Sequence, residues 1–228
     1  MNSYFLVLSE EGEPAMNMAI DEALLFSFID KPLLRLYYWD RPSITIGYFQ
    51  SYAEMDYPGC SIIRRATGGG VVDHRKSFTF TLFFPREHPF YKMDRYSTYE
   101  IIDKAILLAL ESYGLEVHLH PIDIPDDINR KTMRCYSQPA KFDIVDLRGN
   151  KICGGAQKKS KQGFIHQGYI DLSNYEINYD QLFENKIKNV LEKELLLGKP
   201  SEKTYSKDQT IIGPLFEKYG SKKWNEKR

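Results

Sequence analysis

Apolar residues recur every three to four positions in three segments of the chain, which is the spacing of an amphipathic helix. These segments are residues 14–29, 97–114 and 178–191. The second has the clearest boundaries, because Ser97 and Glu100 form a capping box at its start and Gly114 stands at its end. The pattern predicts three helices, with a weaker one near residues 215–219.

Short runs of β-branched and aromatic residues predict strands between these helices. The runs are residues 33–39, 43–49, 61–65, 77–84, 116–120, 141–147, 151–153 and 163–171. In the clearest, residues 77–84, apolar side chains alternate with mostly hydroxyl-bearing ones. A turn at residues 148–150 joins two of the runs into a hairpin, which Gly154 and Gly155 are expected to break. Strands and helices do not alternate strictly, so we expect an α+β fold with a mostly antiparallel sheet.

At 228 residues the chain is long enough to bury a full core, and it contains neither repeats nor a low-complexity tract. We therefore expect a single domain over residues 1–228, with a core of about residues 3–195 and a polar tail at 196–228. No apolar run approaches the roughly 18 residues that span a bilayer. The first residues turn acidic at Glu10 and Glu11, unlike a signal peptide. These features predict a cytoplasmic protein without a membrane partner.

Charge is balanced, with 31 basic and 31 acidic side chains. This argues against a general nucleic-acid binder, whose affinity comes from neutralising phosphates. Residues 158–161 and 218–228 are locally basic. Either segment is suited to an acidic protein partner, although a solvated face is the more frequent role of such a run.

Cysteine and histidine residues do not form a metal pattern in this sequence. Cys60, Cys135 and Cys153 are odd in number and irregularly spaced, so neither a disulfide framework nor a zinc site is indicated. Any one of the three is a candidate nucleophile. His118 and His120 share one face of a predicted strand but lack a third ligand at suitable spacing. No metal-ligating residue is therefore predicted.

The segment with the most distinctive chemistry is residues 64–74. It contains Arg64, Arg65, Gly68, Gly69, Gly70 and His74. Three consecutive glycines let a ligand approach the backbone N–H groups, and arginine forks fit an anion. It is not a P-loop, because no Gly-Lys-Ser/Thr follows. By itself the segment indicates an anionic ligand, or else a flexible turn between two strands.

Two further segments complete the set of candidate functional residues. Cys135 lies within residues 134–139, Arg-Cys-Tyr-Ser-Gln-Pro, and Lys151 is followed by Gly154, Gly155, Ala156 and Gln157. With the motifs at residues 17–24, 34–50, 64–74 and 166–168, the ordered set resembles the catalytic domain of lipoate-protein ligases, octanoyltransferases and biotin-protein ligases. The resemblance covers roughly residues 3–175.

This resemblance implies a large mixed sheet flanked by helices, similar to class II aminoacyl-tRNA synthetases and biotin ligases. It also implies an apolar tunnel for the acyl chain, with the acyl carbonyl beside Lys151. That ammonium group can stabilise a developing oxyanion, although a structural salt bridge is its simpler role. The implied substrate- or nucleotide-binding residues are Arg64, Arg65, Gly68, Gly69, Gly70, His74, Gly154, Gly155, Ala156, Gln157 and His166.

Two reaction branches follow from the resemblance. A ligase uses ATP and Mg²⁺ to activate lipoate as lipoyl-adenylate, with the residues 64–70 loop at the phosphates. A transferase needs no cofactor: an acyl-carrier protein donates octanoate to Cys135, and Lys151 is the cation expected to lower the thiol pKa. The acceptor in both branches is a lysine of a lipoyl domain, in a 2-oxoacid dehydrogenase or the glycine cleavage H protein.

Some residues favour the ligase reaction and others favour the transferase reaction. The third glycine, Gly70, favours a ligase, and Cys135 is either an acyl acceptor or a buried small residue. Asp73 and Arg75 depart from the residues usual around the histidine. The expected lack of an accessory C-terminal domain favours a transferase, or a ligase completed by a second subunit. A non-catalytic member that binds acyl ligands or lipoyl domains stays open, and biotin is the least favoured substrate.

Overall fold

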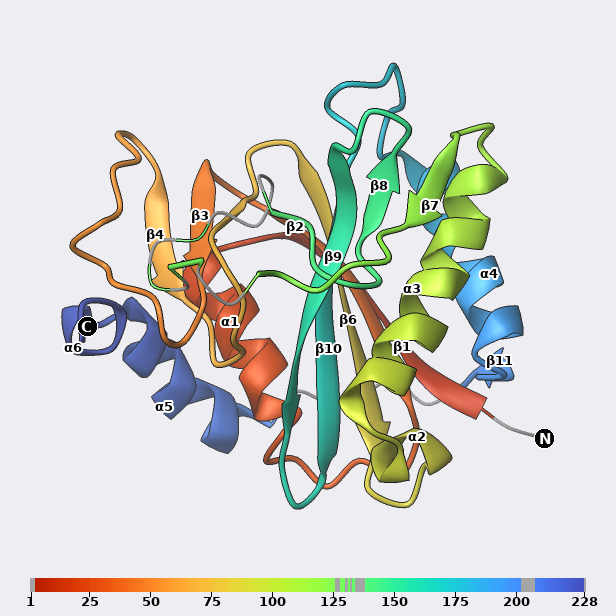
Figure 1. The fold of residues 1–228 in the computed structure, drawn as a ribbon. Coiled ribbons are helices and arrows are strands. Elements are labelled where there is room, and N and C mark those ends of the chain that lie inside the picture. The colour runs from red at the N-terminus through yellow and green to blue at the C-terminus, as the bar shows by residue number, and fades with distance from the viewer. Residues whose placement is uncertain are drawn as a thin grey trace.

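Two β-sheets form the centre of the molecule, and helices cover both faces of the larger one (Figure 1). The structure is a computed structural model that describes residues 3–125, 128–129, 131, 133, 138–201 and 208–227, without the side chains of residues 9 and 10. The strands are β1 (Ser3–Gly12), β2 (Leu33–Trp39), β3 (Ser43–Ile46), β4 (Ser61–Arg64), β5 (Val72–Asp73), β6 (Ser77–Pro85), β7 (Val117–Leu119), β8 (Ile144–Asp146), β9 (Lys151–Lys159), β10 (Gly163–Asp171) and β11 (Lys199–Pro200). The helices are α1 (Pro14–Ala23), α2 (Pro89–Lys92), α3 (Arg95–Glu111), α4 (Gln181–Glu194), α5 (Gln209–Gly220) and α6 (Lys222–Asn225).

The larger sheet has eight described strands in the order β11-β1-β2-β6-β10-β9-β8-β7. Its β1 runs parallel to both neighbours, β11 and β2, whereas the other described pairs are antiparallel. In the smaller sheet, β3 lies between the parallel β4 and the antiparallel β5. The predicted α+β class with a mixed, mostly antiparallel sheet is confirmed.

Alternation along β2 shows how the two faces of the large sheet are covered. Leu34 and Leu36 point into the core formed with α3 and α4, whereas Tyr37 and Trp39 point into the cluster formed with α1 and α5. Figure 1 shows these two helix pairs on opposite sides of the sheet. Because both faces are buried, side chains on the central strands lie among packed helices and not in solvent.

The break predicted at Gly154 and Gly155 is wrong, because β9 continues through both glycines to Lys159. A Cβ added to Gly154 would lie 2.3 Å from Cε of Lys151, and one added to Gly155 would lie 2.3 Å from Nε2 of His166. These glycines therefore leave room for neighbouring side chains inside a continuous strand. A strand interior with two glycines was not distinguishable from a turn by sequence pattern.

The polar tail predicted at residues 196–228 also requires correction, because β11, α5 and α6 lie within it. Helix α5 packs against α1 and buries Ile212 and Tyr219. At this contact Lys218 forms an ion pair with the buried Glu22. Gly213 and Pro214 lie inside α5, and because both residue types are unfavourable within a helix, the sequence gave only a weak helical signal near residues 215–219.

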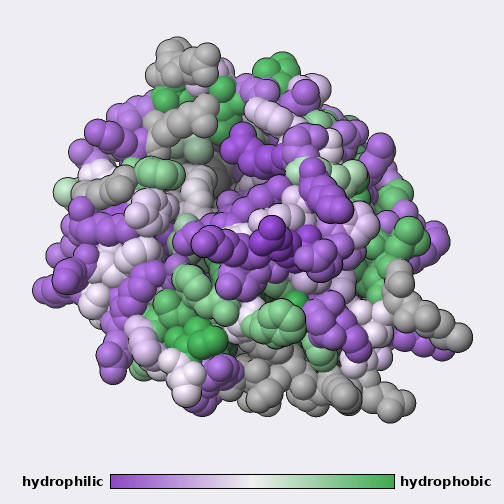
Figure 2. All heavy atoms as spheres, turned by 90° about the horizontal axis from the view of Figure 1, so that it is seen from below, coloured by the Kyte–Doolittle hydropathy of each residue, from purple (hydrophilic) through white to green (hydrophobic). Residues whose placement is uncertain are grey.

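The face seen from below in Figure 1 is largely hydrophilic, with smaller hydrophobic patches (Figure 2). The turn between β9 and β10 lies at this lower end of the molecule (Figure 1). Here Lys158 pairs with Glu22, with Nζ–Oε1 at 3.3 Å, and Lys159 donates to the carbonyls of Tyr91 and Met93. Two lysines of the basic 158–161 segment therefore have structural partners. Across the described residues, no helix has the length and apolar character needed to cross a bilayer.

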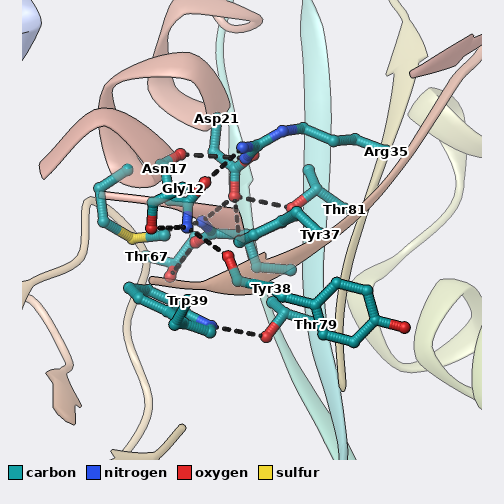
Figure 3. Close-up of polar contacts among 12 residues, drawn as sticks. Gly12, Asn17, Asp21, Arg35, Tyr37, Tyr38, Trp39, Thr67, Thr79 and Thr81 are labelled. Carbon is teal, nitrogen blue, oxygen red and sulfur yellow. Dashed lines mark hydrogen bonds and ion pairs between the residues drawn. The ribbon is translucent and has the colours of Figure 1, made fainter. Parts of the chain in front are cut away.

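A buried ion pair joins α1 to β2 near the middle of the sheet (Figure 3). Nη1 of Arg35 lies 2.6 Å from Oδ1 of Asp21, and each side chain is 1% exposed. The Arg35 guanidinium also donates to Oδ1 of Asn17 at 2.6 Å. A buried pair of charges is tolerated only when such additional hydrogen bonds satisfy its remaining donors and acceptors.

The second carboxylate oxygen of Asp21 accepts hydrogen bonds from three strands of the large sheet, β2, β6 and β10. It accepts hydrogen bonds from Tyr37 at 2.8 Å, from Thr81 at 2.7 Å and from Gln167 at 2.7 Å. The Gln167 side chain accepts in turn from Thr67 at 2.7 Å. One buried network therefore links α1, β2, β6 and β10 to Thr67, near the start of the segment between β4 and β5. This segment, residues 65–71, is called the glycine-rich loop below.

Replacing Asp21 by alanine is expected to lower the free energy of unfolding by about 3–5 kcal/mol, because it leaves the Arg35 charge buried without its counterion. Urea unfolding followed by circular dichroism measures the change. Asp40→Ala is the control, since its partner Arg41 is 51% exposed and such pairs contribute little. Equal losses in the two variants would contradict a dominant role for the buried network.

Candidate functional site

The glycine-rich loop connects β4 to β5 and is held against the turn that follows β3. The Tyr48 amide donates to the Thr67 carbonyl at 2.9 Å. A Cβ added to Gly47 would lie 2.0 Å from the carbonyl oxygen of Gly69, so the two backbones are in contact there. Gly69 has a φ of 89°, a conformation that favours glycine. Gly69 is therefore needed for the close contact with Gly47, whatever contact the three glycines make with a ligand.

Arg64, which was expected to bind an anion, lines neither of the two cavities described below. Its side chain is fully buried, and Nη1 donates to the carbonyls of Gly47, Tyr48 and Gln50 at 3.2, 3.0 and 2.7 Å. Nε and Nη2 donate to the carbonyl of Asn225 at 3.2 and 2.9 Å. The guanidinium is thus an internal brace that gathers backbone carbonyls behind the loop.

Arg65 is buried as well, but it reaches the wall of a cavity. Its Nη2 donates to the carbonyls of Gly68 and Gly70, each at 2.9 Å, and Nη1 donates to Thr45 at 2.7 Å. These bonds set the curvature of the loop from within. Arg65 therefore shapes the loop backbone that was expected to receive the ligand.

His74 is a buried, neutral side chain. Its Nε2 lies 2.8 Å from Oγ1 of Thr45, Nδ1 lies 3.1 Å from Oγ of Ser77, and the ring stacks on Trp39 with centroids 4.2 Å apart. Burial, together with the nearby Arg65 charge, holds its pKa well below the ordinary range. His74 therefore forms part of the aromatic wall of a cavity, beside Trp39.

Two adjoining cavities lie on either side of the glycine-rich loop and β9. The narrow cavity, of about 30 Å³, is lined by Met18, Tyr37, Trp39, Thr45, Arg65, Gly69, Val72, His74, Thr79, Gly154, Gly155, Ala156, Gln167, Gly168 and Tyr169. The wide cavity, of about 540 Å³, is lined by Gly68, Gly69, Gly70, Arg95, Tyr96, Tyr99, Asp123, Ile124, Pro125, Met133, Gln138, Ala140, Lys141, Asp143, Lys151, Gly155, Ala156 and Gln157. Gly69, Gly155 and Ala156 line both cavities, so these residues mark their junction.

Lys151 lines the wide cavity, whose walls also include Gly68–Gly70. Its Nζ lies 2.6 Å from Oδ2 of Asp143, and the two side chains are 4% and 3% exposed. The same Oδ2 accepts from the Ala140 amide at 2.5 Å. The salt bridge considered as the simpler role of Lys151 is therefore present, and it holds the ammonium group at the edge of the cavity.

His166 is separated from both cavities and contacts a residue that lines one of them. Its Nδ1 accepts from Nε2 of Gln157 at 3.1 Å, and Oε1 of Gln157 accepts from Thr98 at 3.1 Å. The other ring nitrogen, Nε2, lies 3.8 Å from Oδ1 of the buried Asp103. His166 thus contacts Gln157 and is not among the residues that line either cavity.

The described cysteines do not supply a nucleophile at these cavities. Cys153 is buried in β9, and burial raises the pKa of its thiol well above the ordinary range. Cys60 is half-buried and lines neither cavity. Cys135 lies outside the described residues, so its expected proximity to Lys151 stays a prediction. No cluster of three or more potential metal-ligating side chains occurs in the described part of the chain.

Sequence reasoning placed most of the glycines and Lys151 at cavity walls but missed the apolar wall and the supports. Met18, Tyr37 and Trp39 fell within the predicted helix and strand and within motifs of the resemblance, but none of the three was predicted to line a cavity. Asp143 and Asn225 were not singled out at all. The roles of Asp143 and Asn225 depend on partners that lie elsewhere in the chain, and no local sequence pattern predicts such partners.

The C-terminal helices complete the support of the glycine-rich loop. The side chain of Asn225 accepts from the Arg64 amide at 2.9 Å, and Nε1 of Trp224 donates to the Arg64 carbonyl at 2.8 Å. The Asn225 amide group donates to the Tyr219 carbonyl at 2.7 Å. Helix α6 is thereby bonded to the residue from which the loop departs.

His166 is expected to make stability depend on pH, because burial lowers its pKa from 6.5 to about 3. Below pH 6.5 the unfolded chain binds a proton that the folded protein does not, so stability falls as the pH drops toward 3. The expected loss is up to about 1.4 kcal/mol per pH unit. Urea unfolding of wild type and His166→Gln at several pH values isolates this slope. A His118→Gln control on an exposed strand position should keep it, and a wild-type slope in His166→Gln would contradict the assignment.

Asn225→Ala is expected to loosen the glycine-rich loop while leaving the large sheet intact. The substitution leaves the buried Arg64 amide without its acceptor, which costs about 1–3 kcal/mol. Hydrogen–deuterium exchange should increase in residues 64–71 and stay unchanged in β10. Lys223→Ala, at an exposed position of the same short helix, serves as the control. Unchanged exchange in residues 64–71 of Asn225→Ala would show that α6 does not support the loop.

Comparison with known proteins adds family relationships to this geometry. Residues 13–195 match the family described as the lipoyl protein ligase A/B catalytic domain. The chain is 32% identical over 217 residues to octanoyltransferase LipM of Oceanobacillus iheyensis, an alignment that covers 90% of this chain and 75% of that protein.

Solved structures of similar shape come from Thermoplasma acidophilum. Ta0514, a putative lipoate protein ligase with bound lipoic acid, has a TM-score of 0.79 at 24% identity and covers 99% of this chain and 100% of its own. A bi-partite lipoate protein ligase, studied with its E2 lipoyl domain, has a TM-score of 0.75 at 21% identity and covers 99% of this chain and 97% of its own. At these identities the likeness shows a shared fold.

Proposed function

The chain belongs to the lipoyl protein ligase A/B catalytic-domain family, and from this premise we propose that it transfers an octanoyl group from a thioester donor, through Cys135, to the acceptor lysine of a lipoyl domain. The family resemblance expected from the motifs is confirmed. Attachment of a lipoyl or octanoyl group in protein lipoylation is the chemistry named for its relatives. The choice between transferase and ligase, and the roles of individual residues, belong to the proposal.

The observation that carries the proposal is the junction of an apolar and a polar cavity beside a buried ammonium group. The narrow cavity suits an acyl tail, and the wide cavity suits the polar remainder of a donor. At the junction, Gly69, Gly155 and Ala156 present only backbone and one methyl group. Their small size would leave room for the carbonyl group of the acyl chain. Lys151 borders the polar side, where its N–H groups can stabilise a developing oxyanion.

The narrow cavity must widen to receive an eight-carbon chain. Its volume of about 30 Å³ corresponds to roughly one or two water molecules. Each methylene that becomes buried contributes about 0.8 kcal/mol, which favours opening the space. Met18 lines the cavity and is the adaptable member of its wall, because an unbranched thioether side chain repacks readily.

The proposed reaction has two acyl-transfer steps. The Cys135 thiolate attacks the carbonyl carbon of the donor thioester, and the donor sulfur leaves and takes up a proton. The amine of the acceptor lysine then attacks the new thioester, forming an amide and returning Cys135 to its thiol. In both steps negative charge develops on the acyl oxygen, which is the charge that Lys151 would stabilise.

A transferase is favoured over a ligase because the named relative at 32% identity is an octanoyltransferase, whereas the ligase structures share the fold at lower identity. In the ligase alternative, ATP would occupy the wide cavity. Asp123 and Asp143 are the carboxylates there, the ligand type that Mg²⁺ takes together with nucleotide phosphates. Lipoyl domains of 2-oxoacid dehydrogenases, the glycine cleavage H protein and an acyl-carrier donor remain the proposed partners.

The function is tested by incubating the protein with an apo lipoyl domain and either octanoyl-acyl-carrier protein or lipoate with ATP and Mg²⁺. We expect octanoylation from the carrier alone, seen as a mass increase of the lipoyl domain. Cys135→Ser should abolish it, and Cys60→Ser should not. Lys151→Ala should lower kcat by about 10²–10³, the usual cost of losing an oxyanion donor.

Other outcomes would identify the alternatives. A requirement for ATP, with full activity in Cys135→Ser, would establish the ligase branch and refute the transferase. Absence of product from either donor, with acyl ligands still bound, would indicate a non-catalytic member of the family.

A further inference from the structure

The arginines expected to hold an anion at the site are engaged by the protein's own backbone. Arg64 donates to carbonyls behind the loop, and Arg65 donates to the loop carbonyls of Gly68 and Gly70. An acyl donor that carries phosphate still requires cationic groups beside its path. The wide cavity has cations of its own, Arg95 and Lys141, in addition to Lys151.

Arg95 and Lys141 come from separate segments and flank the same aromatic ring. Cζ of Arg95 lies 5.2 Å from the centroid of Tyr96, and Nζ of Lys141 lies 5.9 Å from it. Lys141 is also 5.2 Å from the centroid of Phe142, whose ring packs edge-on against Tyr96 at 6.4 Å. The guanidinium group of Arg95 and the ammonium group of Lys141 therefore lie near the same ring on the cavity wall.

Both segments adopt arrangements that cost stability. Arg95 is the first residue of α3, where the helix dipole disfavours a cation, and it directly follows the N-cap Asp94, whose carboxylate suits that position. Phe142 has a φ of 73°, which is unusual for a bulky residue, and its amide donates to the His120 carbonyl at 2.8 Å. Strained conformations of this kind cluster at ligand sites.

Asp143 connects this part of the wall to the proposed catalytic lysine. Its Oδ2 accepts from the Ala140 amide, in the turn that carries Lys141, and also from Nζ of Lys151. That carboxylate therefore balances the Lys151 charge. Asp123, which is exposed, is the other carboxylate among the described lining residues. Among the described lining residues, the three cations Arg95, Lys141 and Lys151 thus outnumber the two carboxylates.

We propose that Arg95 and Lys141 bind the phosphate group of the acyl donor while its thioester lies beside Lys151. This inference rests on the proposed acyl-transfer function and adds the recognition of the donor. A thioester joined by a flexible arm to a phosphate ester, the prosthetic arm of an acyl-carrier protein, has the required chemistry. A nucleotide phosphate shares that chemistry and is distinguished by experiment.

The test compares two donors that differ only in the phosphate, octanoyl-4′-phosphopantetheine and octanoyl-pantetheine. Wild type should prefer the phosphorylated donor through its KM. The double variant Arg95→Ala/Lys141→Ala should raise that KM about tenfold or more, as expected for lost charge-assisted hydrogen bonds, with kcat within about twofold. Its KM for octanoyl-pantetheine should not change. Arg95→Lys, which keeps the charge, should recover part of the preference.

Lys104→Ala is the matched control, because Lys104 lies on the same helix, is 62% exposed and lines neither described cavity. It should behave as wild type with both donors. Equal effects of the double variant on the two donors, or no effect on either, would overturn the proposal. A loss of folding would appear as a fall in kcat with both donors, and circular dichroism would detect it directly.

Binding measurements separate this inference from the proposed function. If neither thioester supports turnover, isothermal titration with 4′-phosphopantetheine and with ATP is performed on wild type and the double variant. Weaker binding of 4′-phosphopantetheine by the variant supports a carrier-arm site, and a selective loss of ATP binding assigns the same cations to a nucleotide. Unchanged binding of both compounds, or no binding by wild type, overturns the phosphate site even if the family chemistry is correct.

Discussion

The buried ion pair between Asp21 and Arg35 is the interaction on which the arrangement of the site depends. It lies between α1 and β2, and its remaining hydrogen bonds include partners on α1, β2 and β6. Through Gln167 and Thr67 it reaches the glycine-rich loop. Such a pair stabilises little by itself, because desolvation offsets the Coulomb attraction. Its effect is to allow few alternative positions for the loop relative to the sheet.

The loop is fixed from three directions, and this explains why its arginines are not available as surface ligands. Gln167 holds Thr67 from the sheet, Arg65 holds the glycine carbonyls from within, and α6 holds Arg64 from outside. Backbone carbonyls are therefore satisfied by buried guanidinium groups. The amides and small residues at the junction of the cavities can then be left for a ligand.

The three cations that line the wide cavity, Lys151, Arg95 and Lys141, have different surroundings. Lys151 is held by a carboxylate at the polar cavity, beside the junction where the carbonyl of a donor is proposed to lie. Arg95 and Lys141 lie on aromatic rings at another part of the same wall. A buried, paired cation suits a developing charge in the reaction, whereas partly exposed cations suit a phosphate that must bind and leave. We therefore propose different chemistry for basic residues that line the same cavity.

Local patterns determined the fold class, most element positions, the family and the glycines of the cavity junction. They sufficed because alternation and ordered motifs are properties of neighbouring residues; the capping box predicted at Ser97 was wrong, since α3 begins at Arg95 with Asp94 as its N-cap. Only the tertiary structure decided that Arg64 is a brace, that His166 lies behind the wall, and that β9 continues through Gly154 and Gly155. It also brought Asn225 to Arg64, across 161 positions of the chain. The direction in which a charged side chain points depends on partners distant in sequence, and no spacing rule contains that information.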